Sequence, residues 1–169
     1  HGASYDLTLP SIDAHVKGRR IGWLGDWGGA FPMEAGLMSH SEEAIPQLEA
    51  LGIIVEPVAP PFSADAIWES WTTLRSWAIA GGLSVFYNDA SKRDHLKPEA
   101  IWEIERGLSF SAMDVHRASV LRSDWFKICS TLFEQYDALV LPTTQLYPFP
   151  VVWTYPNEVG GQAMGTYHR

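Results

Sequence analysis

The sequence has only one cysteine, Cys129, and fewer basic than acidic side chains. A single thiol excludes an internal disulfide framework and a zinc site built from several cysteines, and it fits a reducing, cytoplasmic location. Lys and Arg number 12 against 20 Asp and Glu, which gives a formal net charge of -8. Because that charge repels a phosphate backbone, we expect no nucleic acid among the partners.

Long apolar runs are also missing. No stretch approaches the ~20 apolar residues that a transmembrane helix needs, and no basic segment followed by an apolar one marks a signal peptide. We therefore expect no membrane association. The hydrophobic share of 46%, with 8 Trp, 6 Tyr and 7 Phe, is instead typical of a folded globular chain.

The motifs of several common enzyme classes are absent. Gly-x-Ser-x-Gly, which exposes a catalytic serine above an α/β sheet, does not occur. No two histidines stand at the His-x-x-x-His spacing of a helical metal site, and Asp114 and His116 point apart on a helix. We accordingly expect no metal and no cofactor, and we assign Cys129, which has apolar neighbours in mid-helix, to the core.

A glycine-rich loop follows the first predicted strand. Gly22, Gly25, Gly28 and Gly29 match neither Gly-x-Gly-x-x-Gly nor the Walker spacing, and the carboxylate of Asp26 opposes a bound phosphate. A tight structural turn is the first interpretation of these glycines. A small-molecule site formed by residues 25–29 and nearby strand ends is the alternative.

Strand and helix signals alternate in the first sixty residues. An apolar strand pattern covers residues 20–24, helical spacing covers 37–51, and a second strand pattern covers 53–58. Pro46 inside the helical pattern predicts a kink or break near residues 44–45. The succession of strand, helix and strand predicts a βαβ unit with parallel strands.

Long helices are predicted for the middle of the chain. Residues 63–65 provide an N-cap for a helix that runs to about residue 78. Pro98 fits the first turn of a second helix, and Gly107 predicts its break or bend. A Ser111–Asp114 capping box lies within a further helical pattern that continues to Tyr136.

The last part of the chain begins with a short apolar run over residues 138–141, which predicts a buried strand. The three prolines of residues 142–150 predict an ordered, aromatic-rich loop after it. The residues before Thr166 look like the beginning of a helix, and neither chain end falls at a natural domain boundary. We therefore predict an α/β fold, a mixed or parallel sheet fragment flanked by long helices, with residues 1–169 forming a single incomplete domain.

Several phrases of the sequence, in their order and spacing, resemble the amidase signature family. They are residues 20–26 (RIGWLGD), Lys97–Glu99 with Glu103–Gly107, Tyr136–Thr144 (YDALVLPTT), Pro148–Pro150, Gly160–Gly161 and Tyr167–Arg169. The resemblance covers nearly the whole chain and corresponds to the family's region downstream of its catalytic segment. Single phrases of this kind are common, so the specificity lies in their succession.

The resemblance implies part of a hydrolase that cleaves carboxamide C–N bonds with a Ser-Ser-Lys triad. The Gly- and Ser-rich segment that supplies the family's two serines has no counterpart here, and the four lysines (Lys17, Lys92, Lys97, Lys127) lie in unrelated contexts. No catalytic residue is therefore assigned, and the chain alone is expected to be inactive. The implied partners are the remainder of the parent amidase chain and a small-molecule amide substrate, and a homo-oligomer stays open.

Thr143, Thr144 and Gln145 are the candidate substrate-binding residues. They follow a predicted strand, and ligands of open α/β sheets bind beyond the carboxyl ends of the strands. The same residues fit a second role, which is to turn the chain from a buried strand into a Pro-rich loop. Tyr147 and Phe149 fit contact with an apolar acyl group or simple packing.

Two other functions stay open beside the amidase interpretation. One is a non-catalytic α/β domain that binds a small molecule or regulates another protein, with residues 25–29 and the strand ends as its site. The other is a scaffold that only assembles with another chain.

Overall fold

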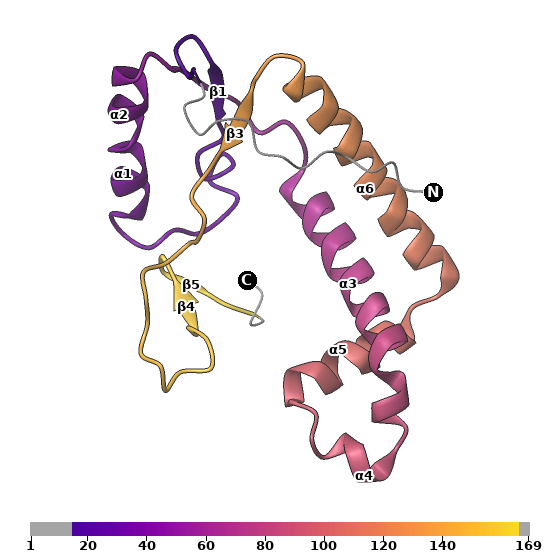
Figure 1. Ribbon diagram of the computed structural model, residues 1–169. Coiled ribbons are helices and arrows are strands. Elements are labelled where there is room, and N and C mark those ends of the chain that lie inside the picture. The colour runs from indigo at the N-terminus through magenta and orange to yellow at the C-terminus, as the bar shows by residue number, and fades with distance from the viewer. Residues whose placement is uncertain (1–14, 166–169) are drawn as a thin grey trace. The chain divides into compact units, whose positions relative to one another are not determined.

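The computed structural model describes residues 15–165, so the family phrase at Tyr167–Arg169 lies outside the described residues. The chain divides into two compact units (Figure 1). The first takes its described residues from His1–Val58 and Tyr136–Arg169, and the second is Ala59–Gln135. The single incomplete domain expected from the sequence stays a prediction.

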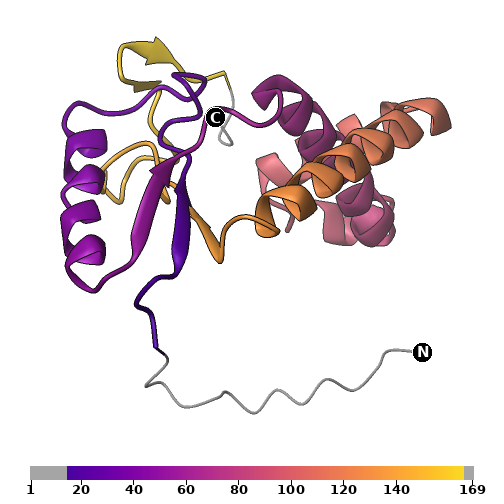
Figure 2. The same cartoon turned by 90° about the horizontal axis from the view of Figure 1, so that it is seen from above.

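The first unit is built on three parallel strands in the order β2-β1-β3. They are β1 (Arg20–Trp23), β2 (Ile54–Pro57) and β3 (Ala138–Val140). Ile21 of the central strand lies opposite Val55 on one side and Ala138 on the other. Helices α1 (Leu37–Glu42) and α2 (Ile45–Ala50) connect β1 to β2 and run alongside the strands (Figure 2). The predicted βαβ unit with parallel strands is confirmed.

The helical segment between β1 and β2 is broken where the sequence predicts it. Helix α1 ends at Glu42 and α2 begins at Ile45, with Pro46 in its first turn, where the missing N–H costs no hydrogen bond. Gly52, with φ of 82°, ends α2, and its N–H donates to the carbonyl of Glu49 over 2.8 Å.

A small hairpin near the end of the described chain replaces a predicted helix start. Strands β4 (Glu158–Val159) and β5 (Gln162–Ala163) pair antiparallel. Gly160 and Gly161 between them have φ of 56° and 81°, the left-handed conformation of a tight hairpin turn. The expected beginning of a helix before Thr166 is therefore wrong, because two successive left-handed glycines turn the chain back on itself.

The second unit consists of helices only. They are α3 (Ala64–Tyr87), α4 (Ala90–Arg93), α5 (Pro98–Ser109) and α6 (Ala112–Phe133). The caps are those predicted: the Ser63 side chain accepts from the Ala66 N–H, Pro98 opens α5, and Ser111 and Asp114 form a complete capping box. No helix within residues 15–165 combines the length and apolar character that a bilayer crossing requires.

Helices α3 and α5 approach each other closely at Gly107. A Cβ atom at this position would lie 2.1 Å from the carbonyl oxygen of Ser76 and 2.7 Å from the Cβ of Ala80. Ile104, one turn earlier, is fully buried. The sequence predicted a break or bend at Gly107. A break is wrong, because α5 continues to Ser109 and the missing side chain serves helix packing instead.

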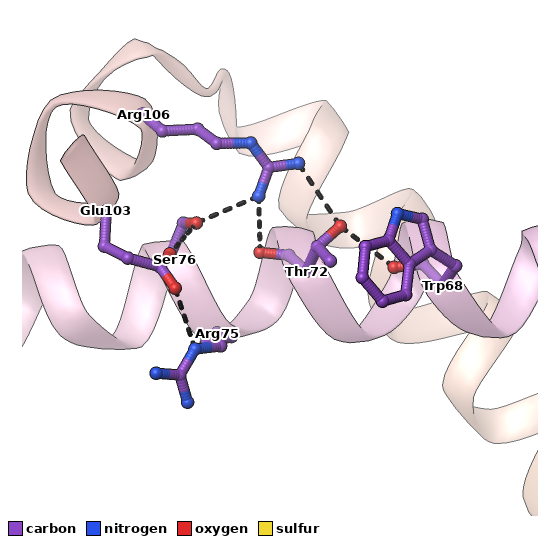
Figure 3. A network of polar contacts seen from close by, with 6 residues as sticks. All are labelled: Trp68, Thr72, Arg75, Ser76, Glu103 and Arg106. Atoms are coloured by element: carbon purple, nitrogen blue, oxygen red, sulfur yellow. Dashed lines mark hydrogen bonds and ion pairs between the residues drawn. The ribbon is translucent and has the colours of Figure 1, made fainter. Parts of the chain in front are cut away.

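A buried network of polar side chains joins the same two helices (Figure 3). Glu103, with 1% of its surface exposed, accepts hydrogen bonds from the Ser76 hydroxyl and from Arg75 Nε, the latter over 2.7 Å. Arg106 donates to the Ser76 hydroxyl over 2.9 Å and to the Thr72 carbonyl over 2.8 Å. Each buried polar group is thereby satisfied, which a buried charge requires.

Substitution Gly107→Ala should destabilise the protein by about 1–3 kcal/mol, because the added methyl group must separate α3 from α5. Gly81→Ala is the matched control: Gly81 is also helical, lies on α3 and has open space where a Cβ would stand. This control should be neutral or stabilising by up to about 1 kcal/mol. Urea unfolding of both variants measures the difference, and equal stabilities would contradict the close approach.

Candidate functional site

The candidate residues line a hollow at the carboxyl edge of the three-stranded sheet. Thr143, Thr144 and Gln145 share a space of about 390 Å³ with Gly25 and Asp26, while the other lining residues are Phe31, Met33, Leu141, Pro142 and Leu146. The two loops meet because β1 and β3 are parallel and end at the same edge, where the Leu24 N–H donates to the Val140 carbonyl over 2.9 Å. We call this space the strand-end hollow.

The three candidate residues differ in what their side chains do. The Gln145 side chain donates from Nε2 to the Pro32 carbonyl over 2.9 Å. The backbone carbonyl of Gln145 accepts from the Glu34 N–H over 2.8 Å. The Thr144 hydroxyl is engaged locally with Leu146. Both side chains therefore hold the shape of the loop, and both interpretations of the three residues stay open. The exposed Thr143 hydroxyl makes no hydrogen bond to any other described residue, so it is available to a ligand.

The glycine loop opposite them has an unusual backbone. Gly25, Trp27, Gly28 and Gly29 all have φ between 56° and 80°, and Asp26 Oδ1 accepts from the Gly29 N–H over 2.9 Å. Trp27 is the one non-glycine residue with positive φ in the described chain, and its burial at 6% exposure offsets that conformational cost. The predicted tight turn is confirmed. The alternative use of this loop stays open, because Gly25 and Asp26 also line the strand-end hollow.

A second hollow of about 390 Å³ is lined by the later residues of the Pro-rich loop, and Leu146 lines both hollows. Its aromatic wall contains Tyr147 and the stacked pair of Phe149 and Trp153, whose ring centroids are 6.4 Å apart. Glu34 Oε2 accepts from the Tyr147 N–H over 2.7 Å and fixes the loop there. The sequence predicted an aromatic-rich loop but missed Trp153 and Glu34, since neither lies in a recognisable motif.

Arg20 and Asp137 fasten the three strands below these hollows. Asp137, which directly precedes β3, accepts from the Arg20 N–H over 2.8 Å and from Arg19 Nη1 over 2.6 Å. Arg20 also donates from Nη2 to Glu56 of β2 over 2.6 Å. The backbone N–H of Arg20, followed by the guanidinium of Arg19, lowers the pKa of Asp137. We call these contacts of Arg19, Arg20, Glu56 and Asp137 the charged clamp. The clamp lies at the start of the strands, whose register positions Thr143 to Gln145.

Two further kinds of candidate chemistry concern clustered metal ligands and the Cys129 thiol. Between residues 15 and 165 no three His, Cys, Asp or Glu side chains gather as a metal site would require. Cys129 is half-buried rather than enclosed in the core, and burial raises the pKa of its thiol, which opposes formation of a nucleophilic thiolate.

The chain resembles a curated protein in sequence and several solved structures in fold. No family model matches the chain. An acylamidase of Rhodococcus erythropolis is 25% identical over 151 residues, which cover 88% of this chain and 31% of that protein.

Of the solved structures, a bacterial aryl acylamidase of the amidase signature enzyme family superimposes with a TM-score of 0.75 at 19% identity, over 89% of this chain and 33% of its own. A second solved amidase gives a TM-score of 0.76 at 17% identity, over 92% and 34% of the two chains. The chain therefore spans about a third of the length of each of these proteins. The predicted α/β fold class is confirmed.

Replacing Asp137 with Asn should weaken the clamp in a pH-dependent way. A carboxylate whose pKa is lowered on folding stabilises the protein above its unfolded pKa, about 3.9, and loses that effect as pH falls through the lower folded value. The stability difference between the two proteins should be largest near neutral pH and shrink below about pH 4. Unfolding curves over this range measure it.

Asp94→Asn removes the same charge at the end of the short helix α4 and serves as the control. If the stability difference between Asp137→Asn and the unmodified protein did not change with pH, Asp137 would not stabilise the fold as an ionised carboxylate.

Proposed function

We propose that this chain, which has the fold of about one third of an amidase signature enzyme, is part of a hydrolase that cleaves the C–N bond of carboxamides. The family resemblance read from the sequence is confirmed by the comparisons. The acylamidase relative carries the proposal, because it adds similarity in sequence to a similarity in fold that is shared with two solved amidases. Fold alone does not fix a reaction.

In this proposal the chain contributes the strand-end hollow as a wall of the substrate site. The Thr143 hydroxyl donates to, or accepts from, a polar group of the amide substrate. Gln145, bonded to the Pro32 carbonyl, and Thr144, bonded to Leu146, hold the loop in the shape that presents Thr143. No catalytic residue is assigned to this chain, and the nucleophile comes from the remainder of the parent chain. A cytoplasmic location and a homo-oligomer stay predictions.

A non-catalytic small-molecule-binding domain is the second candidate. This candidate places its site at the glycine loop, residues 25–29, and at the strand ends. Gly25 and Asp26 of the loop line one hollow together with Thr143 to Gln145, which follow β3, and this observation favours the candidate. Both candidates predict ligand binding at this edge of the sheet. Only the first predicts that the ligand is hydrolysed.

The intact protein, meaning the parent amidase of which we propose this chain is a part, should release an amine or ammonia from simple aryl and alkyl amides. Residues 1–169 produced alone should not. Mass spectrometry of the acid and amine products measures both. Turnover by the chain alone, retained after repurification, would show that it holds a catalytic centre. Amide binding without turnover by the intact protein would favour the second candidate.

Thr143→Val removes one hydroxyl and keeps the size of the side chain. We expect kcat/KM of the intact protein to fall about five- to tenfold, the effect of losing one hydrogen bond to the substrate, with an unchanged melting temperature. Thr131→Val, on exposed α6 surface, is the matched control and should leave kcat/KM unchanged. Equal kinetics for the two variants would remove Thr143 from the substrate site.

A further inference from the structure

The helical unit contains a hollow that the proposed hydrolase function does not use. It lies between α3 and α6, which run side by side (Figures 1 and 2), and has a volume of about 530 Å³. Its principal walls are Trp71, Leu74 and Arg75 from α3 and Leu121, Arg122 and Trp125 from α6. We call it the helical hollow. Its size is within the range of small-molecule sites.

A hydrogen bond between buried groups joins the two helices beside this hollow. The Ser70 hydroxyl donates to the Ala118 carbonyl over 2.7 Å, and both residues are buried. Such a bond sets the separation of the helices at one point. Trp71, one residue further on, keeps 44% of its surface exposed at the hollow. An apolar ligand can therefore bury ring surface that the helices leave open.

The charged side chains that line the helical hollow are both arginines, in a chain of net charge -8. Arg75 is held in place, because its Nε donates to the buried Glu103 carboxylate and its guanidinium lies 5.7 Å from the Trp71 ring centroid. Its terminal nitrogens point away from Glu103 (Figure 3). Glu103 offsets part of this charge, so Arg122 supplies the larger attraction for an anion.

We propose that the helical hollow binds a small carboxylate with an aromatic or branched apolar body. The apolar body lies between Trp71 and Trp125, against Leu74 and Leu121. The carboxylate accepts hydrogen bonds from Arg122, whose planar fork matches both carboxylate oxygens. The pre-positioned Arg75 adds favourable charge at the opposite wall.

Three ligands that share one aromatic body and differ in charge test this proposal. They are para-trifluoromethyl-phenylacetate, the corresponding phenylethanol and the corresponding phenylethylammonium, and fluorine NMR titration against the intact protein measures their affinities. The carboxylate should bind about tenfold more tightly than the alcohol, because it adds a charge-assisted hydrogen bond, and the ammonium should bind most weakly. None of the three is an amide, so amidase activity does not affect the measurement.

Arg122→Gln identifies the residue responsible. This exposed residue can change without disturbing the core, and we expect the variant to bind the carboxylate about tenfold more weakly while its affinity for the alcohol stays the same. Arg117→Gln removes an arginine from the same helix outside the hollow and should change neither affinity. This pattern distinguishes loss of an anion contact from a change in folding.

Three outcomes would overturn the proposal. Equal affinity for the carboxylate and the alcohol would show an apolar cleft without anion recognition. Unchanged carboxylate binding by Arg122→Gln would place the anion elsewhere. Absence of binding by all three ligands would show that the hollow is not an open site for such small molecules. Each outcome can occur whether or not the protein hydrolyses amides.

Discussion

The parallel pairing of β1 with both β2 and β3 is the constraint on which the structure depends. Parallel neighbours cannot be joined by a tight turn, so each connection must return the chain to the starting edge of the sheet. Helices α1 and α2 make the first return, and the entire helical unit lies in the second, between Val58 and Tyr136. The same pairing brings the ends of β1 and β3 together and so creates the strand-end hollow.

The helical unit depends on a different balance, between a close backbone contact and a buried charge. Gly107 lets α5 approach α3, and this approach removes Glu103 from water. Burying a carboxylate is costly unless charge and hydrogen bonds compensate it, and Arg75, Ser76 and Arg106 supply both. Loss of a single partner would leave the others buried without a match, which makes this network more sensitive than an apolar core of the same size.

Features set by local chemistry could be predicted from the sequence, and features set by distant neighbours could not. Pro46, Ser63 and the Ser111 box act on their own helices, so the break and both caps were predictable. Gly107 has the same local signal whether it ends a helix or admits a neighbouring one. Thr143 to Gln145 were selected because they follow a strand, but their meeting with Gly25 and Asp26 required the register of β1 against β3.

The Asp137 clamp joins parts of the chain that are far apart, and this has a consequence for how the protein folds. Arg19 and Asp137 are separated by 118 positions, so an unstructured chain would lose much entropy in bringing them together. The contacts between α3 and the helices α5 and α6 join residues that are much closer in sequence, so these contacts can form first. Once they form, the helices shorten the effective length of the loop between β2 and β3. We therefore infer that sheet completion, with closure of the clamp, is the late and slow event, and that the strand-end hollow exists only after it.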